Sequence, residues 1–292
     1  MQPSSVPTYR RAWRLFCQFL HSTFPGVQAS LPISAPTLAL FIAYLFDRNY
    51  APSTVNTYVS AIGYFHKLQG FSDPTKIFFI LQMLRGYGKI GMRLDSRLPI
   101  TMPILHKIVS SAAQLSDTYY ITCQFQAMCL FAFNAFARVG EITFSPSGNI
   151  IHLRQLSKLL NDNKEVHALK ITFLNYKHCY NNGQFCLVIS RQSTCCPVLF
   201  MLEYLRLRGS KPGPLFQSQE GLPVSRSEFT SRLSAVIKLC GLDPSRYKGH
   251  SFRIGAASHA ADKGMSDSQI RTLGRWKSNA FLKYIRVQSL AS

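Results

Sequence analysis

One long apolar stretch constrains this fold more than any other part of the sequence. Residues 121–137 read ITCQFQAMCLFAFNAFA, interrupted by Gln124, Gln126 and Asn134. A transmembrane helix needs about 20 predominantly apolar residues, so this stretch is too short and too polar to be one. A helix that is apolar on most of its faces must instead be surrounded by other elements of a globular domain. The sequence therefore predicts a buried central helix over 117–136.

The first third of the chain shows helical periodicity in separate segments. Pro36 and Pro52 stand where a first helical turn would begin, and Gly70 and Gly86 follow the last apolar positions of two segments. The pattern predicts a basic helical bundle over residues 1–86. Its expected helices lie near 9–24, 34–45, 52–70 and 74–86.

The composition changes after this bundle. Residues 87–99 contain glycines, basic residues and a closing Pro99, with limited apolar content. Such a composition is typical of an interdomain linker. Residues 100–292 then form a second domain.

The second domain is expected to combine helices with short strands. The tripeptide Asn181-Asn182-Gly183 predicts a hairpin turn between two of the strands. Helical patterns cover 102–115, 117–136, 196–209 and 225–241, and strand patterns cover 149–153, 168–175 and 184–190. The expected fold class is mainly α with a small antiparallel β-sheet.

The charge of the chain indicates a polyanionic partner. The 33 Lys and Arg residues outnumber the 13 Asp and Glu residues, so the formal net charge is +20. Residues 1–93 hold nine basic and two acidic residues, which leaves about +7 there and about +13 in the remainder. A basic surface of this kind suits nucleic acid. Because both halves are basic, we expect both domains to contact the polyanion as the two arms of a clamp.

The cysteines and acidic residues argue against disulfide and metal chemistry. The eight cysteines form no C-x-x-C pair and show no Cys/His ligand spacing. We expect them to be reduced, as in a cytosolic or nuclear protein. The N-terminus is polar and basic, unlike a secretory signal. The sequence also lacks the carboxylate cluster that a magnesium nuclease needs. We therefore expect neither a metal ion nor a cofactor.

The segment 249–286 holds the residues that suggest a reaction. His250 and Arg253 are three residues apart, and on a helix such residues share a face. Arg presents a planar charged fork to phosphate oxygens, and His adds a further donor. A Gly-Arg-Trp turn follows at 274–276, and Tyr284 comes eight residues after the tryptophan. These residue types suit attack by Tyr284 on a phosphodiester without a metal ion.

This segment resembles the C-terminal motif of the tyrosine recombinases, the phage integrase-like family. The Gly-Arg-Trp form at 274–276 and the Tyr-Ile-Arg ending at 284–286 are most similar to the recombinases of Crypton and DIRS-like eukaryotic mobile elements. The resemblance implies a helical, SAM-like core-binding domain and a catalytic domain that together form a C-shaped clamp on DNA. It also implies a 3′-phosphotyrosine intermediate at Tyr284, formed without metal or ATP.

The resemblance further implies roles for residues elsewhere in the chain. Arg138, at the end of the predicted central helix, corresponds to the family's first catalytic arginine, with Glu141 as its supporting acid. An exposed structural salt bridge between the two is the alternative. Lys177, in the expected hairpin, corresponds to the lysine that protonates the departing sugar oxygen, and a solvated surface lysine is the alternative. His250 and Arg253 would bind the phosphate together with Arg138.

One position departs from the family's commonest pattern, which has a histidine nine residues before the tyrosine. Counting nine residues back from Tyr284 reaches Arg275, whereas Trp276 lies eight residues back. In some members a tryptophan occupies this site and donates its indole N–H to the phosphate. We assign the position to Trp276 with a turn shortened by one residue, and Arg275 is the alternative. Core packing of Trp276 is a further interpretation, and it is compatible with the first.

The expected function is site-specific recombination or integration by a mobile-element enzyme. The alternatives are a type IB topoisomerase, which shares the chemistry but relaxes supercoils, and a domesticated, inactive DNA-binding protein. The resemblance implies double-stranded DNA as the partner and a tetramer on two DNA sites. It places the protein in the nucleus if the element is eukaryotic, and otherwise in the cytoplasm.

Overall fold

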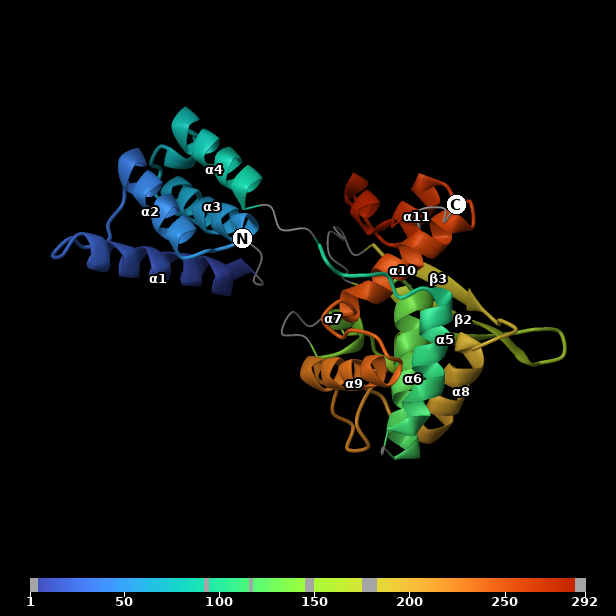
Figure 1. The fold of residues 1–292 in the computed structure, drawn as a ribbon. Helices are drawn as coiled ribbons and strands as arrows, with labels where there is room; N and C mark the ends of the chain where they lie inside the picture. Colours follow the sequence, from blue (N-terminus) through green and yellow to red (C-terminus); the bar gives the residue numbers. More distant parts are fainter. Residues whose placement is uncertain (1–4, 92–94, 116–117, 145–149, 175–182, 287–292) are drawn as a thin grey trace. The chain divides into compact units, whose positions relative to one another are not determined.

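The chain divides into two units, Met1–Asp95 and Ser96–Ser292. A computed structural model describes residues 5–91, 95–115, 118–144, 150–174 and 183–286 (Figure 1). The division falls inside the segment that the sequence suggests as a linker.

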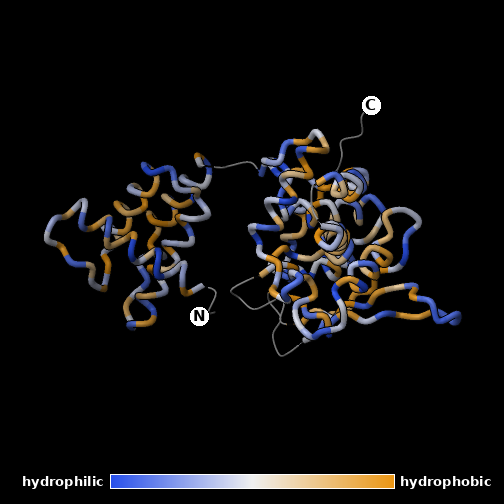
Figure 2. Tube along the Cα trace, turned by 90° about the horizontal axis from the view of Figure 1, so that it is seen from below, coloured by the Kyte–Doolittle hydropathy of each residue, from blue (hydrophilic) through white to orange (hydrophobic). Residues whose placement is uncertain are grey.

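The N-terminal unit is a helical bundle. Phe16 meets Phe41 edge to face, with ring centroids 5.2 Å apart, in a core rich in aromatic rings. Figure 2 shows apolar residues gathered in the interior of the unit. Ser34 caps α2 by accepting a hydrogen bond from the Thr37 amide at 3.2 Å. The described elements are α1 (Val6–Thr23), α2 (Ala35–Asp47), α3 (Pro52–Leu68), the 3₁₀ turn η2 (Pro74–Lys76) and α4 (Phe78–Ile90).

Helix α4 continues into the expected linker, so the predicted end at Gly86 was wrong. The reason is Tyr87, which is buried and packs against the Phe46 ring at 4.9 Å. Its hydroxyl also donates a hydrogen bond to the Tyr50 carbonyl. These contacts keep the backbone helical past two glycines.

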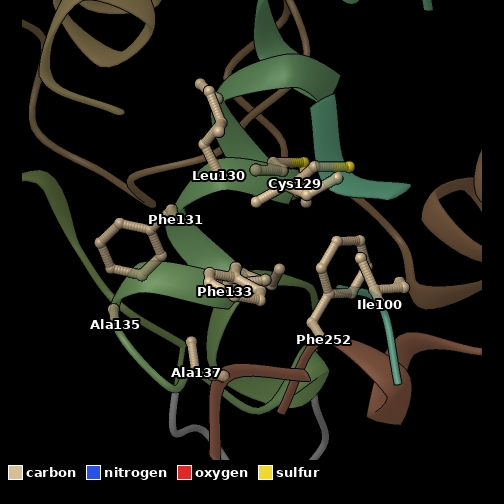
Figure 3. Close-up of a cluster of buried hydrophobic side chains, with 14 of the residues drawn as sticks. Ile100, Cys129, Leu130, Phe131, Phe133, Ala135, Ala137 and Phe252 are labelled. Carbon is tan, nitrogen blue, oxygen red and sulfur yellow. The ribbon is translucent and has the colours of Figure 1, made fainter. Parts of the chain in front are cut away.

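The C-terminal unit is built around α6 (Tyr119–Asn134), as the sequence predicts. Three helices pack against it: α5 (Met102–Ser111), α8 (Pro197–Arg208) and α10 (Gly249–Asp262) (Figure 1). Figure 3 shows Phe131 on one side of α6, and Ile100 and Phe252 together on the other. No helix in the described part of the chain is long and apolar enough to cross a membrane.

The described strands form one antiparallel sheet in the order β1-β2-β3: β1 (Leu156–Leu160), β2 (Val166–Phe173) and β3 (Phe185–Ser190). Phe173 and Phe185 are register partners at the end of the β2–β3 pair. The first strand was expected at 149–153, and this was wrong. The Ile151 backbone bonds to Glu141 and Leu215 outside the sheet, and a 3₁₀ turn, η4 (Leu153–Gln155), precedes β1.

Short elements complete the unit and carry its C-terminal residues. They are the 3₁₀ turn η3 (Ala112–Gln114), α7 (Val139–Ile142), α9 (Arg226–Leu239), α11 (Asp267–Leu273) and the 3₁₀ helix η5 (Asn279–Tyr284). Tyr284 therefore ends a 3₁₀ helix. With three residues per turn, this helix places Tyr284 on the same face as Phe281, which is buried in the core.

Candidate active site

The chain leaves α6 in a tight turn that presents Arg138. Phe136 adopts a left-handed conformation with φ +48°, and Arg138 then occupies the N-cap position of α7. The Glu141 carboxylate accepts hydrogen bonds from the Arg138 amide at 2.8 Å and from its Nη1 at 3.0 Å. Glu141 thus fixes both the backbone and the guanidinium of Arg138.

The pair of Arg138 and Glu141 is not the exposed salt bridge considered as an alternative. Glu141 is only 5% exposed, and its Oε2 also accepts a hydrogen bond from Nη2 of Arg275 at 2.8 Å. One buried carboxylate is therefore shared between two guanidinium groups that lie far apart in the sequence.

Two glycines bring α10 close to its neighbours. A Cβ on Gly255 would lie 1.9 Å from the Ile100 carbonyl oxygen, and a Cβ on Gly249 would lie 2.2 Å from Cγ2 of Val139. Only glycine permits such an approach. Because α10 carries His250 and Arg253 in its first turns, these contacts set the position of both side chains.

Arg253 lies in the interior of the site, with 1% of its surface exposed. It donates hydrogen bonds to the carbonyl oxygens of Phe136 and Gly274. Its Cζ lies 4.1 Å from the centroid of the Trp276 ring. Burial, followed by the charges of Arg138 and Arg275, lowers the pKa of Arg253 to about 9. Among the described residues, Arg138, Arg253 and Arg275 meet one carboxylate, that of Glu141, so an anion would be favoured here.

Tyr284 meets three of the expected residues. Its hydroxyl lies 2.9 Å from Nε2 of His250, within hydrogen-bond distance. The rings of Trp276 and Tyr284 are 5.0 Å apart, and Cζ of Arg253 lies 5.8 Å from the Tyr284 ring centroid. Residues distant in the sequence thus converge around the Tyr284 side chain.

The structure places Trp276, and not Arg275, beside Tyr284. Arg275 takes a left-handed conformation with φ +55°, which turns its side chain inward toward Glu141. Gly274 makes room for the tryptophan, because a Cβ there would lie 1.6 Å from an atom of the indole ring.

The chain matches known proteins by fold and not by sequence. No protein-family profile matches the chain, and no curated protein matches it. A lambda integrase dimer bound to a COC′ core site matches with a TM-score of 0.67 and 13% identity, over 100% of this chain and 92% of that one. XerH site-specific recombinase bound to a palindromic difH substrate matches with a TM-score of 0.65 and 13% identity, over 98% and 77%. The Tn1549 transposon integrase in complex with circular intermediate DNA matches with a TM-score of 0.65 and 12% identity, over 99% of this chain and 92% of that one.

The chain has the tyrosine-recombinase fold. Its residues Arg138, His250, Arg253, Trp276 and Tyr284 lie in one site of this fold. Lys177 lies outside the described residues. Among the residues that are described, no group of three His, Cys, Asp or Glu side chains is placed to hold a metal ion.

The site also contains groups that sequence patterns did not reveal. The Phe136 carbonyl accepts hydrogen bonds from both Arg253 and Arg275, and the Phe173 ring lies 3.6 Å from Cζ of Arg275. A main-chain acceptor has no signature in the sequence. The strand pattern over 168–175 includes Phe173 but does not indicate its contact with Arg275.

A hollow lies beside the first turn of α10, in the same unit. One face of α9 lines it with hydroxyl groups between cations, Arg226 near its start and Lys238 near its end. Lys248, which precedes α10, also lines it. This basic, hydroxyl-lined surface adjoins the helix that carries His250.

Proposed function

We propose that the protein is a DNA strand-exchange enzyme that cuts and rejoins DNA through Tyr284. The observation that carries this proposal is the 2.9 Å contact between the Tyr284 hydroxyl and Nε2 of His250, next to Arg253 and Trp276. A phenol beside a proton acceptor and surrounded by cations suits attack on a phosphodiester. The tyrosine-recombinase fold supports the same reaction.

In the proposed step, the Tyr284 oxygen attacks the phosphorus and its proton passes to His250. The bond between phosphorus and the 5′ oxygen breaks, and this oxygen takes a proton from a general acid, for which the sequence suggests Lys177. The products are a 3′-phosphotyrosine and a free 5′-hydroxyl. A 5′-hydroxyl of another strand reverses the step, so the bond energy is retained and ATP is not required.

Arg138 and Arg253 neutralise the non-bridging oxygens in this proposal. The Arg138 side chain is 27% exposed and available to a ligand, whereas Arg253 lies behind Trp276 and Tyr284. Phosphate contact with Arg253 therefore requires the Tyr284 ring to move aside. In the proposed step the phenol oxygen stays within reach of Nε2 of His250, which takes its proton during the attack.

Double-stranded DNA is the proposed substrate, and the net charge of +20 supports it. The structural matches include recombinases and integrases in complex with DNA sites. We further propose that both units clamp the duplex, that four copies assemble on two sites, and that the enzyme serves a mobile element. The Gly-Arg-Trp and Tyr-Ile-Arg motifs support a eukaryotic element and hence action in the nucleus.

A nicked suicide substrate tests the reaction. A pool of nicked duplexes with randomised sequence is incubated with the protein, and covalent complexes are isolated under denaturing conditions. The wild type should give a covalent band, Tyr284→Phe should give none, and Tyr119→Phe, which removes an exposed hydroxyl elsewhere, should keep it. A band that persists in Tyr284→Phe would refute the proposed nucleophile.

A second assay separates strand exchange from relaxation. DNA sequences recovered from the covalent complexes are placed in pairs on a supercoiled plasmid. Recombinant circles support the proposed function, whereas relaxation without recombinants would show a topoisomerase instead. Neither product, together with retained DNA binding, would show an inactive DNA-binding protein.

A further inference from the structure

Arg275 is a buried arginine whose side chain is 0% exposed. Its partners in the structure are protein groups of the turn after α6, of α7 and of β2. Its φ of +55° is a conformation that costs about 1–2 kcal/mol for a residue other than glycine. Two main-chain hydrogen bonds at the end of α11 support this conformation, from the Arg275 amide to the Thr272 carbonyl at 3.0 Å and from the Trp276 amide to the Arg271 carbonyl at 2.9 Å. The side-chain contacts of Arg275 add to this support.

These contacts use both terminal nitrogens of the guanidinium and its flat face. Nη1 donates to the Ala135 carbonyl at 3.2 Å, and Nη2 donates to the Phe136 carbonyl at 3.3 Å and to Oε2 of Glu141 at 2.8 Å. The plane of the group lies against the Phe173 ring, 3.6 Å from Cζ to the centroid. A flat fork can satisfy acceptors on two sides and stack on a ring at once, whereas a lysine ammonium cannot.

Two of the acceptors are shared with the arginines that face the substrate. Glu141 also accepts hydrogen bonds from the Arg138 amide and guanidinium, and the Phe136 carbonyl also accepts one from Arg253. Arg275 therefore bonds to both shared acceptors, the Glu141 carboxylate and the Phe136 carbonyl. It links the group that holds Arg138 to a group that holds Arg253.

We propose that Arg275 is a positioning residue that sets the separation of the Arg138 and Arg253 guanidinium groups, through Glu141 and the Phe136 carbonyl. This inference rests on the proposed function, in which those two groups hold the scissile phosphate. The Phe173 ring braces Arg275 from the sheet, so β2 also supports the placement. Trp276 follows in the chain and turns to the opposite side, toward Tyr284.

The test compares two substrates that differ in charge. Single-turnover cleavage is measured on the duplex captured in the suicide assay, and on the same duplex with a methylphosphonate at the scissile position. The methyl group replaces one charged non-bridging oxygen with a neutral group. A neutral centre depends less on two correctly spaced cations, so misplaced arginines should matter less for it.

The variant Arg275→Lys keeps the charge and loses the fork. If the two arginines shift by about 1 Å, cleavage of the phosphodiester should slow by about 100-fold. Cleavage of the methylphosphonate should slow by less than about tenfold relative to the wild type on that substrate. Phe173→Leu, which removes the ring beneath the guanidinium but keeps apolar volume, should show the same pattern with a smaller effect.

Arg208→Lys is the matched control. Arg208 is also buried, at 7% exposure, and donates to several backbone carbonyl oxygens away from the site, including those of Pro214 and Leu215. Any general loss of stability should appear in this variant too, with equal effects on both substrates. Melting temperatures of all variants are recorded in parallel.

Equal slowing of Arg275→Lys on both substrates, or no slowing, would overturn the inference. If Arg275→Lys is unfolded at the assay temperature, the inference is tested with Phe173→Leu, by comparing its slowing on the phosphodiester with its slowing on the methylphosphonate. A wild type without a Tyr284-dependent band would instead refute the proposed function itself, so the two failures are distinguishable.

Discussion

Replacing Gly255 by alanine should damage both stability and catalysis. The added Cβ would lie 1.9 Å from the Ile100 carbonyl oxygen and 2.7 Å from its carbon. Ordinary contact begins near 3.4 Å, so α10 and the Ile100 backbone must separate by about 1.5 Å, the difference between 3.4 and 1.9. The Ile100 backbone cannot easily yield, because its amide donates to the Ser251 carbonyl of α10 at 3.0 Å.

The structure gives the size of both effects. Overpacking of this kind costs about 1–3 kcal/mol, and backbone against backbone lies at the upper end. About 3 kcal/mol corresponds to a fall in melting temperature of about 6–12 °C for a unit of this size. A shift of about 1 Å in His250 and Arg253 should also lower the cleavage rate by about 100-fold.

Thermal unfolding and single-turnover cleavage of the suicide duplex measure the two effects. Gly88→Ala, in the last turn of α4, is the matched control, since a Cβ there meets nothing within 4 Å. It should leave cleavage unchanged and raise stability by about 0.5–1 kcal/mol. A Gly255→Ala protein that melts with the wild type and cleaves at its rate would show that the close approach does not hold the site.

Three further outcomes are expected. Trp276→Phe keeps an aromatic ring beside Tyr284 but loses the indole N–H, so single-turnover cleavage should slow by about 10- to 100-fold; an unchanged rate would show that the ring only packs. Inorganic phosphate should raise the melting temperature more than chloride at equal ionic strength, because an anion offsets the clustered arginines; Arg138→Gln should lose most of this difference, and an equal response of both proteins would contradict it. Replacing Arg226 and Lys238 by glutamine should reduce the slope of log affinity against log salt by about 1 for each phosphate that is no longer neutralised; an unchanged slope would place the DNA elsewhere.

Periodicity was enough to predict the helices because burial of one face dominates their formation. The central helix α6 and the N-terminal bundle follow directly from apolar spacing. The end of α4 and the strand expected at 149–153 were predicted wrongly because tertiary contacts determine the backbone there. Tyr87 extends α4 past two glycines by packing on Phe46, and the Ile151 backbone bonds to Glu141 of α7 and to Leu215 rather than to a strand of the sheet.

The candidate site shows a similar division. Spacing and residue type were enough to select His250, Arg253 and Tyr284, which the structure brings together. The choice between Arg275 and Trp276 could not be made from spacing, because it depends on a positive φ at residue 275. The burial of Glu141 was equally hidden, since its second partner lies 134 residues further along the chain.

One serine ties the chain at Tyr284 and just after it. The Ser258 hydroxyl donates to the Tyr284 carbonyl at 3.3 Å and accepts from the Arg286 amide at 2.8 Å. Since Ser258 lies on the same α10 helix as His250, we expect a subunit to keep the Tyr284 phenol in its own pocket and not to lend it to a neighbour. Mixing Tyr284→Phe subunits with Arg253→Met subunits should therefore restore no cleavage. Every working pocket in an assembly would come from a single polypeptide.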